Sequence, residues 1–195
     1  MNYIFYIMGR SCSGKDTVFK ELKKRFPNLQ SVLMHTTRPI RTGEVQGVDY
    51  RFDTMDEFRT HCRKNDIFEL RTYKTEYGDW HYYTTEDSID LKKGSYLGVG
   101  TPSSYDSLMD YFKESLIPIY LKVEEYDLLS RALEREHRQK EPKYTELCRR
   151  FLADSEDFSE ERLKSIGITE KDTFPNIQID QTIDQIAEYI QGYMK

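Results

Sequence analysis

The sequence has few cysteines, no long hydrophobic run and no excess of basic residues. Each of these three absences excludes a class of protein. Its three cysteines, Cys12, Cys62 and Cys148, are odd in number and far apart, which argues against a disulfide framework and against a zinc site. We therefore expect reduced thiols in a cytoplasmic protein. No apolar run reaches the roughly 18 residues of a membrane-spanning helix. The apolar start, MNYIFYIMG, lacks a basic leader and a small-residue cleavage site, so we expect no signal peptide.

The charge balance of the chain is acidic. Its 29 basic and 34 acidic residues give a net charge of −5, whereas general binding to nucleic acid requires a basic excess. A chain of 195 residues forms one domain, or one core with insertions, and buries a core without help from disulfides or metals. We expect small-molecule partners rather than nucleic acid or membranes, in a monomer or a homodimer.

A glycine-rich stretch near the amino terminus, GRSCSGKDT at residues 9–17, resembles a phosphate-binding loop. It follows the pattern G-x-x-x-x-G-K-[ST] through Gly9, Gly14 and Lys15. Asp16 stands where the pattern has Ser or Thr. The sequence therefore raises two alternatives, a nucleotide-binding loop with an unusual metal position or a glycine turn at an ordinary strand–helix junction.

The surroundings of this stretch favour nucleotide binding. Residues 3–8 are a continuous apolar run, which is typical of a strand buried on both faces of a parallel sheet. Residues 18–26 carry apolar side chains at helical spacing, with lysines on the other side. A strand, a glycine turn and a helix are the context in which such a loop binds phosphate.

The chemistry of such a loop assigns roles to its residues. Its backbone N–H groups cradle phosphate oxygens, and Lys15 reaches the β- and γ-phosphates of ATP. The usual Ser or Thr hydroxyl contacts Mg²⁺; here Asp16 offers a carboxylate, which is a good Mg²⁺ ligand, and Thr17 offers a hydroxyl one residue further. The predicted ATP-binding residues of the loop are Gly9, Ser11, Cys12, Ser13, Gly14, Lys15, Asp16 and Thr17, with Asp16 and Thr17 as the metal ligands.

The rest of the chain alternates predicted strands and helices, which favours an α/β fold. Residues 35–95 are polar and rich in aromatic and turn residues, as in an inserted subdomain. Residues 124–164 are highly charged, and within them residues 128–158 predict two helices broken near Pro142; on charge alone, a solvated helical pair is an equally good interpretation. The other predicted elements are helices at 56–65 and 103–112, strands at 68–73, 80–83, 95–101 and 117–123, and a last strand and amphipathic helix within 176–194.

A second group of residues lies in HTTRPIRTGEVQGVDYRF, residues 35–52. Arg38 and Arg41 flank Pro39, and two guanidinium groups on a stiff loop suit a phosphate monoester. Tyr50 can add a hydroxyl donor. On chemistry alone, a solvated arginine pair is an equally good interpretation.

As a string, residues 36–50 resemble the nucleoside-monophosphate (NMP) site of the guanylate kinase family, T-T-R-x-x-R-x-G-E-x-x-G-x-D-Y. The resemblance covers nearly the whole chain and weakens after about residue 95. It implies the P-loop NMP-kinase fold, a parallel sheet flanked by helices with an inserted mixed α/β NMP-binding subdomain and a helical lid. The implied division is a core of residues 1–34, 96–123 and 165–195, an NMP-binding subdomain of residues 35–95 and a lid of residues 124–164.

The resemblance also implies the residues of an acceptor site. Arg38, Arg41 and Tyr50, with Glu44, would bind the phosphate of GMP, and Glu69 would accept hydrogen bonds from guanine N1 and N2. The stretch HYYTT resembles the family's N-Y-Y-G-[ST], which would place Tyr83 on the phosphate and Thr85 near the base. Before this motif the chain carries extra residues around TEYGDW, residues 75–80.

In the family, arginines of the lid close over the phosphates. Candidates here are Arg131, Arg135 and Arg138 on the first predicted lid helix, and Arg149 and Arg150 match a basic pair on the second. We expect Arg150 to stabilise the transferring group. The resemblance thus implies the catalytic set Lys15, Arg38, Arg41, Arg135 and Arg150, and places Asp180 near the adenine of ATP.

Three departures from the family pattern concern the metal and the base. Asp16 resembles the G-K-D-[ST] loop of a sister family, the ribose 1,5-bisphosphate phosphokinases. Met34 stands where the family usually has a serine whose hydroxyl contacts guanine O6. Gly98 and Gly100 stand in place of a D-x-D strand end of which one aspartate reads the guanine amino group.

The predicted reaction is ATP + GMP → ADP + GDP with Mg²⁺. One alternative is a kinase of the same fold with another phosphorylated acceptor, such as another nucleotide or ribose 1,5-bisphosphate. An alternative of another class is a non-catalytic guanylate-kinase-like module that binds phosphopeptides at the monophosphate site. Such modules typically lack the loop lysine, which this chain retains as Lys15.

Overall fold

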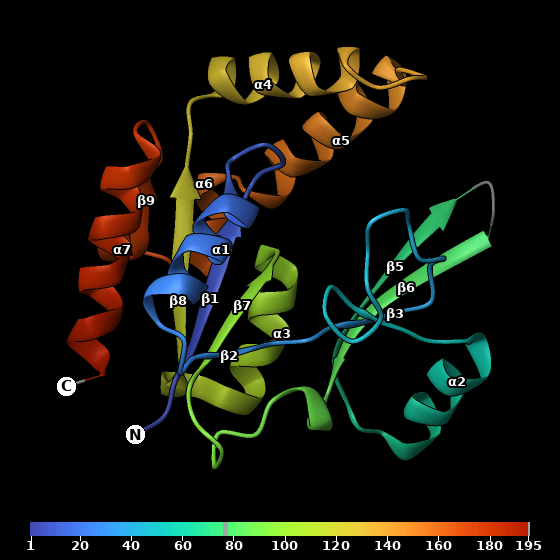
Figure 1. Cartoon of the computed structure of the whole chain (residues 1–195), viewed down its shortest axis with the longest axis vertical. Helices are drawn as coiled ribbons and strands as arrows, with labels where there is room; N and C mark the ends of the chain where they lie inside the picture. The colour runs from blue at the N-terminus through green and yellow to red at the C-terminus, as the bar shows by residue number, and fades with distance from the viewer. Residues whose placement is uncertain (76–77, 195) are drawn as a thin grey trace.

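The computed structural model describes residues 1–75 and 78–194, and its core is a five-stranded parallel sheet (Figure 1). The strand order is β2-β7-β1-β8-β9, so the first strand of the chain lies at the centre. Every neighbouring pair in this sheet is parallel. The strands are β1 (Ile4–Gly9), β2 (Gln30–Ser31), β7 (Tyr96–Gly100), β8 (Leu116–Lys122) and β9 (Thr173–Pro175).

Strand β1 is buried on both faces, as its apolar run predicts. Alternate side chains of a strand point to opposite faces of a sheet. Phe5 and Ile7 accordingly belong to one hydrophobic core, and Ile4, Tyr6 and Met8 belong to the other. The loop that follows β1 is therefore attached to a fully buried strand at the centre of the core sheet.

Helices cover both faces of the core sheet. Apolar side chains of α1 and α7 pack into the core that contains Phe5, and those of α3 and α6 pack into the core that contains Tyr6. The alternation predicted from the sequence, and with it the class of a parallel sheet flanked by helices, is confirmed. These helices are α1 (Lys15–Arg25), α3 (Pro102–Phe112), α6 (Glu160–Ser165) and α7 (Ile179–Tyr193).

A second, four-stranded mixed sheet is formed by residues between β2 and β7, the second and third core strands along the chain. Its strand order is β4-β3-β6-β5, and Figure 1 shows it beside the core with helix α2 below it. A capping box between Thr54 and Glu57 starts α2. The elements are β3 (His35–Thr36), β4 (Arg51–Phe52), α2 (Met55–Lys64), β5 (Ile67–Thr75) and β6 (Gly78–Thr85).

Two helices, α4 (Glu125–His137) and α5 (Tyr144–Asp157), lie beyond the carboxyl ends of the core strands, at the top of Figure 1. The buried Glu136 closes the turn between them, because its carboxylate accepts hydrogen bonds from the Lys143 N–H at 2.6 Å and from Gln139 Nε2 at 2.9 Å. We refer to these helices as the α4–α5 pair. Three short 3₁₀ turns complete the elements, at Glu86–Ser88, Lys113–Ser115 and Glu170–Asp172.

The predicted elements are confirmed with one exception. The last strand was expected within residues 176–194, but β9 is Thr173–Pro175. The backbone N–H of Asn176 still donates to the Lys122 carbonyl of β8 at 2.8 Å, and its side chain binds the carbonyl oxygen of Ser13. Of the predicted extra residues 75–80, residues 76–77 lie outside the described part of the structure.

Two further expectations concern the cysteines and membranes. Cys12, Cys62 and Cys148 are all free thiols. Within residues 1–75 and 78–194, no helix is long and apolar enough to cross a lipid bilayer.

Candidate active site

The glycine-rich loop lies between the carboxyl end of β1 and the start of α1. Cys12 and Gly14 have left-handed backbones, with φ of 64° and 92°. A Cβ atom on Gly9 would lie 2.5 Å from Ser13 Oγ, and one on Gly14 would lie 2.8 Å from Asn176 Nδ2. Close approach therefore requires glycine at both positions, and Gly14 also needs its backbone freedom.

Lys15 is the first residue of α1 and folds back onto the loop. Its Nζ donates to the carbonyl oxygens of Gly9 at 2.5 Å and Arg10 at 2.9 Å. Burial lowers the pKa of Lys15 below its ordinary value, against the opposing effect of Asp154 and Asp16. The loop thus holds the ammonium group in the position from which it can reach a phosphate.

A cavity of about 410 Å³ opens between the loop and helix α4. Three of its lining residues are cations, Lys15, Arg131 and Arg135, and one, Asp16, is an anion. Converging positive charge in a partly enclosed cavity attracts a polyanion such as a triphosphate. The full lining is Ser11, Cys12, Gly14, Lys15, Asp16, Thr17, Arg131 and Arg135.

Asn176 belongs to this region, although it was not among the predicted site residues. It is 4% exposed, and its Nδ2 donates to the carbonyl oxygen of Ser13 at 2.7 Å. It therefore fixes the loop from the far side of the chain. Asp180, which we predicted near the adenine, is exposed on the first turn of α7 and does not line the cavity.

The α4–α5 pair is attached to the loop through Arg10. The guanidinium of Arg10 donates to Glu125 of α4 at 2.7 Å and to Ser155 of α5 at 2.6 Å, and it lies over the Phe151 ring at 4.5 Å. The N–H of the next residue, Ser11, donates to Asp154 Oδ2 at 2.5 Å. The position of the two helices over the cavity is therefore set by loop residues.

Replacing Arg10 with methionine should lower the free energy of unfolding by about 2 kcal/mol, because buried charge-assisted hydrogen bonds contribute roughly 1.5–3 kcal/mol. Urea unfolding measures the loss. The matched control is Arg138→Met, which removes a surface ion pair with Glu134 in which Arg138 is 78% exposed. Such pairs contribute about 0–1 kcal/mol, so equal losses in the two variants would contradict the anchoring role of Arg10.

The predicted phosphate clamp is preformed around Arg38. Arg38 is 4% exposed and makes a bidentate pair with Glu44, at 2.7 and 2.5 Å. The hydrogen bonds from Arg38 lower the pKa of Glu44 to about 2, although burial opposes this. Arg38 also stacks over Tyr50 at 5.0 Å and Phe52 at 5.2 Å. The Arg41 side chain is exposed beside it.

The structure brings Tyr82, not Tyr83, to this clamp. Tyr82 pairs with Thr36 across the sheet, and its ring lies 5.9 Å from that of Tyr50. Tyr83 is fully buried on the opposite face, where its hydroxyl donates to Asp53. Thr85 shares that face with Tyr83 and bonds to His35 at 3.1 Å.

Neighbouring residues of a strand face opposite sides of a sheet. Tyr82 and Thr84 therefore lie on the clamp side of β6, whereas the predicted Tyr83 and Thr85 lie on the other side.

Glu69 is buried in the same sheet and is already paired. Its side chain is 1% exposed, and it accepts from Thr84 Oγ1 at 2.9 Å and from Arg71 Nε at 3.1 Å. Arg71 Nη2 also lies 3.2 Å from the sulfur of Met34. Arg71, which the sequence analysis did not name, thus lies against both Glu69 and Met34.

Gly98 and Gly100 are explained by Tyr6. A Cβ atom on Gly98 would lie 2.8 Å from the Tyr6 ring, and one on Gly100 would lie 1.9 Å from its hydroxyl. The Tyr6 hydroxyl bonds to Ser104 at 2.8 Å. Burial raises the pKa of Tyr6 above its ordinary range. Tyr6 therefore fills the space in which a side chain at position 100 would lie.

The arginines of the α4–α5 pair divide into two groups. Arg131 and Arg135 line the cavity, and Arg131 Nη1 lies 3.5 Å from the Cys12 carbonyl. Arg150 instead lies 3.7 Å from each of Glu136 and Glu146 and does not line it. The expected position of Arg150 over the transferring group is therefore not seen. Arg149 pairs with Glu146 at 2.8 Å.

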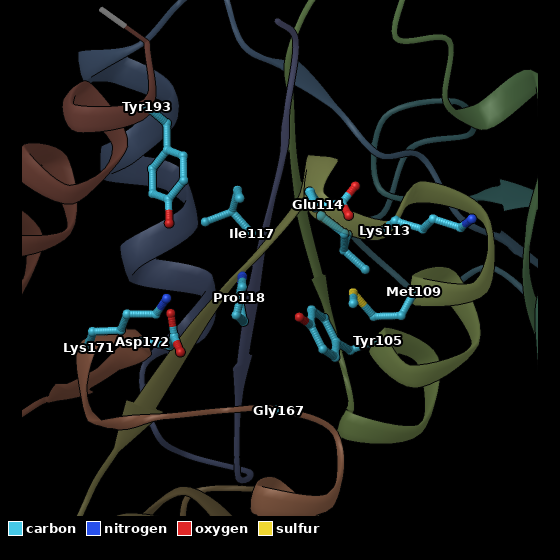
Figure 2. A pocket seen from close by; sticks show the side chains of 11 residues that line it. Tyr105, Met109, Lys113, Glu114, Ile117, Pro118, Gly167, Lys171, Asp172 and Tyr193 are labelled. Carbon is cyan, nitrogen blue, oxygen red and sulfur yellow. The ribbon is translucent and has the colours of Figure 1, made fainter.

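A second cavity, of about 320 Å³, lies at the amino-terminal end of β8 (Figure 2). Tyr105 and Met109 of α3 form one side of it, and Asp172 and Tyr193 lie across from them. None of the loop or clamp residues lines this cavity. It is therefore separate from the candidate site.

The sequence of this chain is similar to that of known proteins of one family. A model of the family described as guanylate kinase matches residues 2–193. The guanylate kinase of Gloeobacter violaceus is 35% identical over 102 residues, which are 52% of this chain and 46% of that protein. That of Helicobacter hepaticus is 25% identical over 130 residues, 67% of this chain and 64% of that protein. In both alignments the chain spans less than two thirds of the relative's length.

A solved structure is similar in fold. The guanylate kinase of Anaplasma phagocytophilum superposes with a TM-score of 0.64 at 19% identity, over 98% of this chain and 86% of that one. At this identity the likeness shows the fold alone.

Proposed function

The chain belongs to the guanylate kinase family, and we propose that it transfers the γ-phosphoryl group of ATP to GMP, giving ADP and GDP. The observation that carries the proposal is the cavity of about 410 Å³ above the loop. One wall of this cavity is the phosphate-binding loop with Lys15, and the other carries Arg131 and Arg135 of α4. Phosphoryl transfer depends on positioning and on stabilising charge, and this arrangement provides both.

On the donor side, the loop amides and Lys15 would bind the phosphates of ATP. Of the predicted loop residues, Gly9 and Ser13 would act by packing, since they do not line the cavity. Arg131 and Arg135 would stabilise charge on the transferring group as α4 closes and excludes water. We retain Arg135 from the predicted catalytic set and add Arg131; Arg150 would need to leave Glu136 and Glu146 to take part.

On the acceptor side, Arg38, Arg41, Tyr50 and Tyr82 would bind the phosphate of GMP. Glu44 would hold the Arg38 fork in its orientation, because the two already form a bidentate pair. Among the described residues, Arg38 Nε is buried without a hydrogen-bond partner, which supports a ligand oxygen nearby. The acceptor phosphate is anionic, so the reaction requires no general base.

The residues also fit a magnesium ion. Asp16 and Thr17 are exposed on the cavity wall at the start of α1 and offer the oxygen ligands that Mg²⁺ prefers. Bound magnesium supplies neutralisation of the phosphate charge. With the ion present, the Asp16 carboxylate would lie near the triphosphate without net repulsion.

The base site would read guanine through Glu69, Thr84 and Arg71. Glu69 is an acceptor suited to the N1 and N2 donors of guanine. Arg71 Nη2 lies against Met34, the position from which a serine contacts guanine O6 in the family. Arginine is a common donor to guanine O6 and N7, so we assign to Arg71 the contact that Met34 cannot make.

We propose the same division into parts as the sequence indicated: a core of residues 1–34, 96–123 and 165–195, an NMP-binding subdomain of residues 35–95, and a lid of residues 124–164. The free thiols and nucleotide substrates support a cytoplasmic location. A monomer suffices for the proposed site, because all its residues come from one chain.

The test is ADP release from ATP with Mg²⁺ against GMP, dGMP, IMP, AMP, CMP, UMP and ribose 1,5-bisphosphate. We expect GMP and dGMP to exceed AMP and the pyrimidine nucleotides by about two orders of magnitude in kcat/KM. A site that hydrogen-bonds a polar group rejects ligands that lack it by a factor of this order or more.

Two results would contradict the assignment of GMP as the acceptor. If ribose 1,5-bisphosphate is phosphorylated and GMP is not, the phosphate clamp is assigned correctly but the acceptor is not GMP. No turnover, together with no binding of ATP by calorimetry, would favour a non-catalytic binding module.

A further inference from the structure

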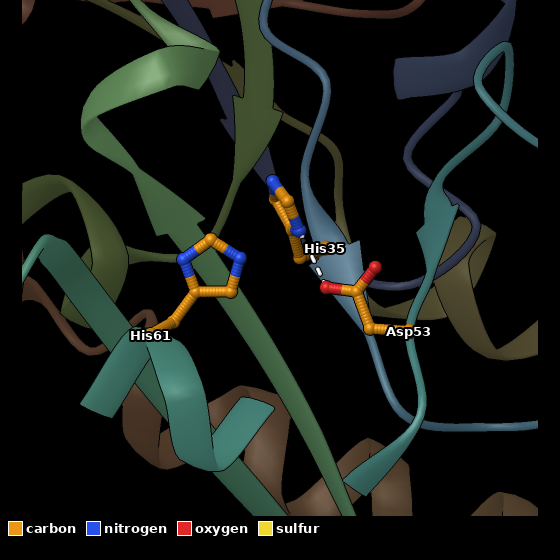
Figure 3. A group of neighbouring side chains, drawn as sticks. All are labelled: His35, Asp53 and His61. Atoms are coloured by element: carbon orange, nitrogen blue, oxygen red, sulfur yellow. Dashed lines mark hydrogen bonds and ion pairs between the residues drawn. The ribbon is translucent and has the colours of Figure 1, made fainter. Parts of the chain in front are cut away.

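Two histidines and an aspartate meet on the face of the second sheet that is turned away from the clamp. His35 belongs to β3, Asp53 follows β4 and His61 belongs to α2, and Figure 3 shows the three side chains pointing toward one another. One ligand atom from each lies within 4.8 Å of the others. We propose that this cluster binds one divalent transition-metal ion, with zinc as the best fit to its donors.

The imidazole of His61 already has the orientation that a metal ligand needs. Its Nδ1 lies 3.0 and 3.1 Å from the two oxygens of Asp66 and donates to that carboxylate. This leaves the Nε2 lone pair, which faces His35 and Asp53 in Figure 3. The described residues offer this nitrogen no hydrogen-bond partner. A metal ion bound between the three side chains would accept this lone pair and would also contact His35 and Asp53.

His35 offers its other ring nitrogen. Its Nδ1 lies 2.6 Å from Asp53 Oδ2, while its Nε2 lies 3.1 Å from Thr85 Oγ1 and 3.7 Å from Asp87 Oδ1. When a metal occupies Nδ1, the ring proton resides on Nε2, where the Thr85 hydroxyl and the Asp87 carboxylate accept it. Both histidines then have a carboxylate behind the nitrogen that faces away from the metal, as metal-binding histidines usually do.

Asp53 supplies the anionic ligand. Its Oδ2 lies 2.6 Å from His35 Nδ1 and accepts a hydrogen bond from the Tyr83 hydroxyl. The side chains of His35, Asp53 and His61 are 3%, 10% and 19% exposed. A metal ion bound here would be largely shielded from bulk solvent and would have one coordination position left for a water molecule.

The donor set selects the class of metal. Magnesium and calcium prefer oxygen ligands, whereas two imidazoles and a carboxylate with one open position form a common zinc site. Three carboxylates, Asp53, Asp66 and Asp87, surround two imidazoles that are neutral when they bind a metal. Arg51 already pairs with Asp87. A divalent cation would therefore balance the two remaining carboxylates.

The site would join α2 to the strands that carry the clamp. His35 lies three residues before Arg38, and Asp53 directly follows Phe52, over which Arg38 packs at 5.2 Å. Occupancy should therefore stiffen this region and raise the unfolding temperature. The inference does not depend on which acceptor the enzyme uses.

The experiment is calorimetric titration of Zn²⁺ into the tag-free, chelator-treated chain. We expect one ion per chain, weakened about a hundredfold or more by His61→Gln and by Asp53→Asn, since even partners behind the ligands cost roughly 10–100-fold in affinity. The matched control is His137→Gln, because His137 lies on α4 and bonds only to Tyr144 among the described residues. Zinc at about 100 times its dissociation constant should raise the unfolding temperature by about 5–10 °C.

Cobalt substitution separates this cluster from the cysteines. Co²⁺ bound by nitrogen and oxygen should show visible d–d bands without a sulfur-to-metal charge-transfer band. Charge transfer from Cys12 or Cys62, or undiminished zinc binding by both folded variants, would overturn the proposal, as would a wild-type chain that binds no zinc at micromolar concentration. If a variant fails to fold by circular dichroism, the wild-type cobalt spectrum still decides between the two ligand sets.

Discussion

Replacing Lys15 with alanine should lower kcat for ADP release by about two to three orders of magnitude, the usual cost of removing one preorganised donor to developing charge. The structure gives the reason. The Gly9 and Arg10 carbonyls hold Lys15 Nζ on the wall of the cavity. The variant therefore loses a positive charge that is already positioned for phosphoryl transfer. The fold should survive, because Val18 and Leu22 of α1, not Lys15, pack into the core.

The matched control is Lys20→Ala, since Lys20 lies exposed on the same helix. Steady-state kinetics with ATP and GMP should find the control within about twofold of the wild type. A Lys15→Ala variant that keeps its kcat would show that the cavity above the loop is not where the phosphoryl group moves. Contaminating kinases are excluded by the same comparison, because their activity would be equal in both preparations.

Local patterns predicted the parts of the fold that local physics determines. The apolar run of residues 3–8 became the central strand, and the glycine turn with its lysine became the loop in front of α1. Two-residue strands such as β2 and β3 carry too little periodicity to be recognised in a sequence. Their pairing is decided by neighbours distant in the chain.

The side of the sheet that each residue of β6 faces is also decided by distant parts of the chain. Tyr82 and Tyr83 are equivalent in the sequence, and only the pairing of β6 with β3 decides which one faces the clamp. The ladder between β5 and β6 also shifts register between Ile67 and Glu69, which no spacing in the sequence reveals. Asn176 reaches Ser13 across 163 residues, so its role depends entirely on tertiary structure.

The cluster of His35, Asp53 and His61 was also not predicted from the sequence. The cysteine count argued against a zinc site, but it carries no information about His35, Asp53 and His61. These residues come from three different elements of the second sheet region. By contrast, the pairing of Glu69 with Arg71 follows strand periodicity, because residues two apart lie on one face, and it could have been predicted.

Replacing Arg71 with methionine should lower the free energy of unfolding by about 3–5 kcal/mol, the usual result of removing one partner from a buried ion pair. Glu69, at 1% exposure, would be left with Thr84 alone. In the intact protein, burial acts to lower the pKa of Arg71, but Glu69 and Tyr6 raise it above its ordinary value, so the guanidinium stays charged. Urea unfolding at neutral pH measures the loss.

The double variant Arg71→Met with Glu69→Gln isolates the cause. It removes both charges and should recover most of the stability, because a neutral amide can still bond to Thr84. Arg59→Met, which breaks an exposed pair with Asp56 in which Arg59 is 64% exposed, should cost less than about 1 kcal/mol.

These results bear on the acceptor because the same two side chains are the proposed readers of guanine. The double variant is compared with Glu69→Gln alone, because both lack the Glu69 carboxylate and they differ only at position 71. If Arg71 also donates to guanine O6, the double variant should prefer GMP over AMP less than Glu69→Gln does. Equal preferences in the two variants, measured as kcat/KM on the preparations used for unfolding, would exclude Arg71 from the base site.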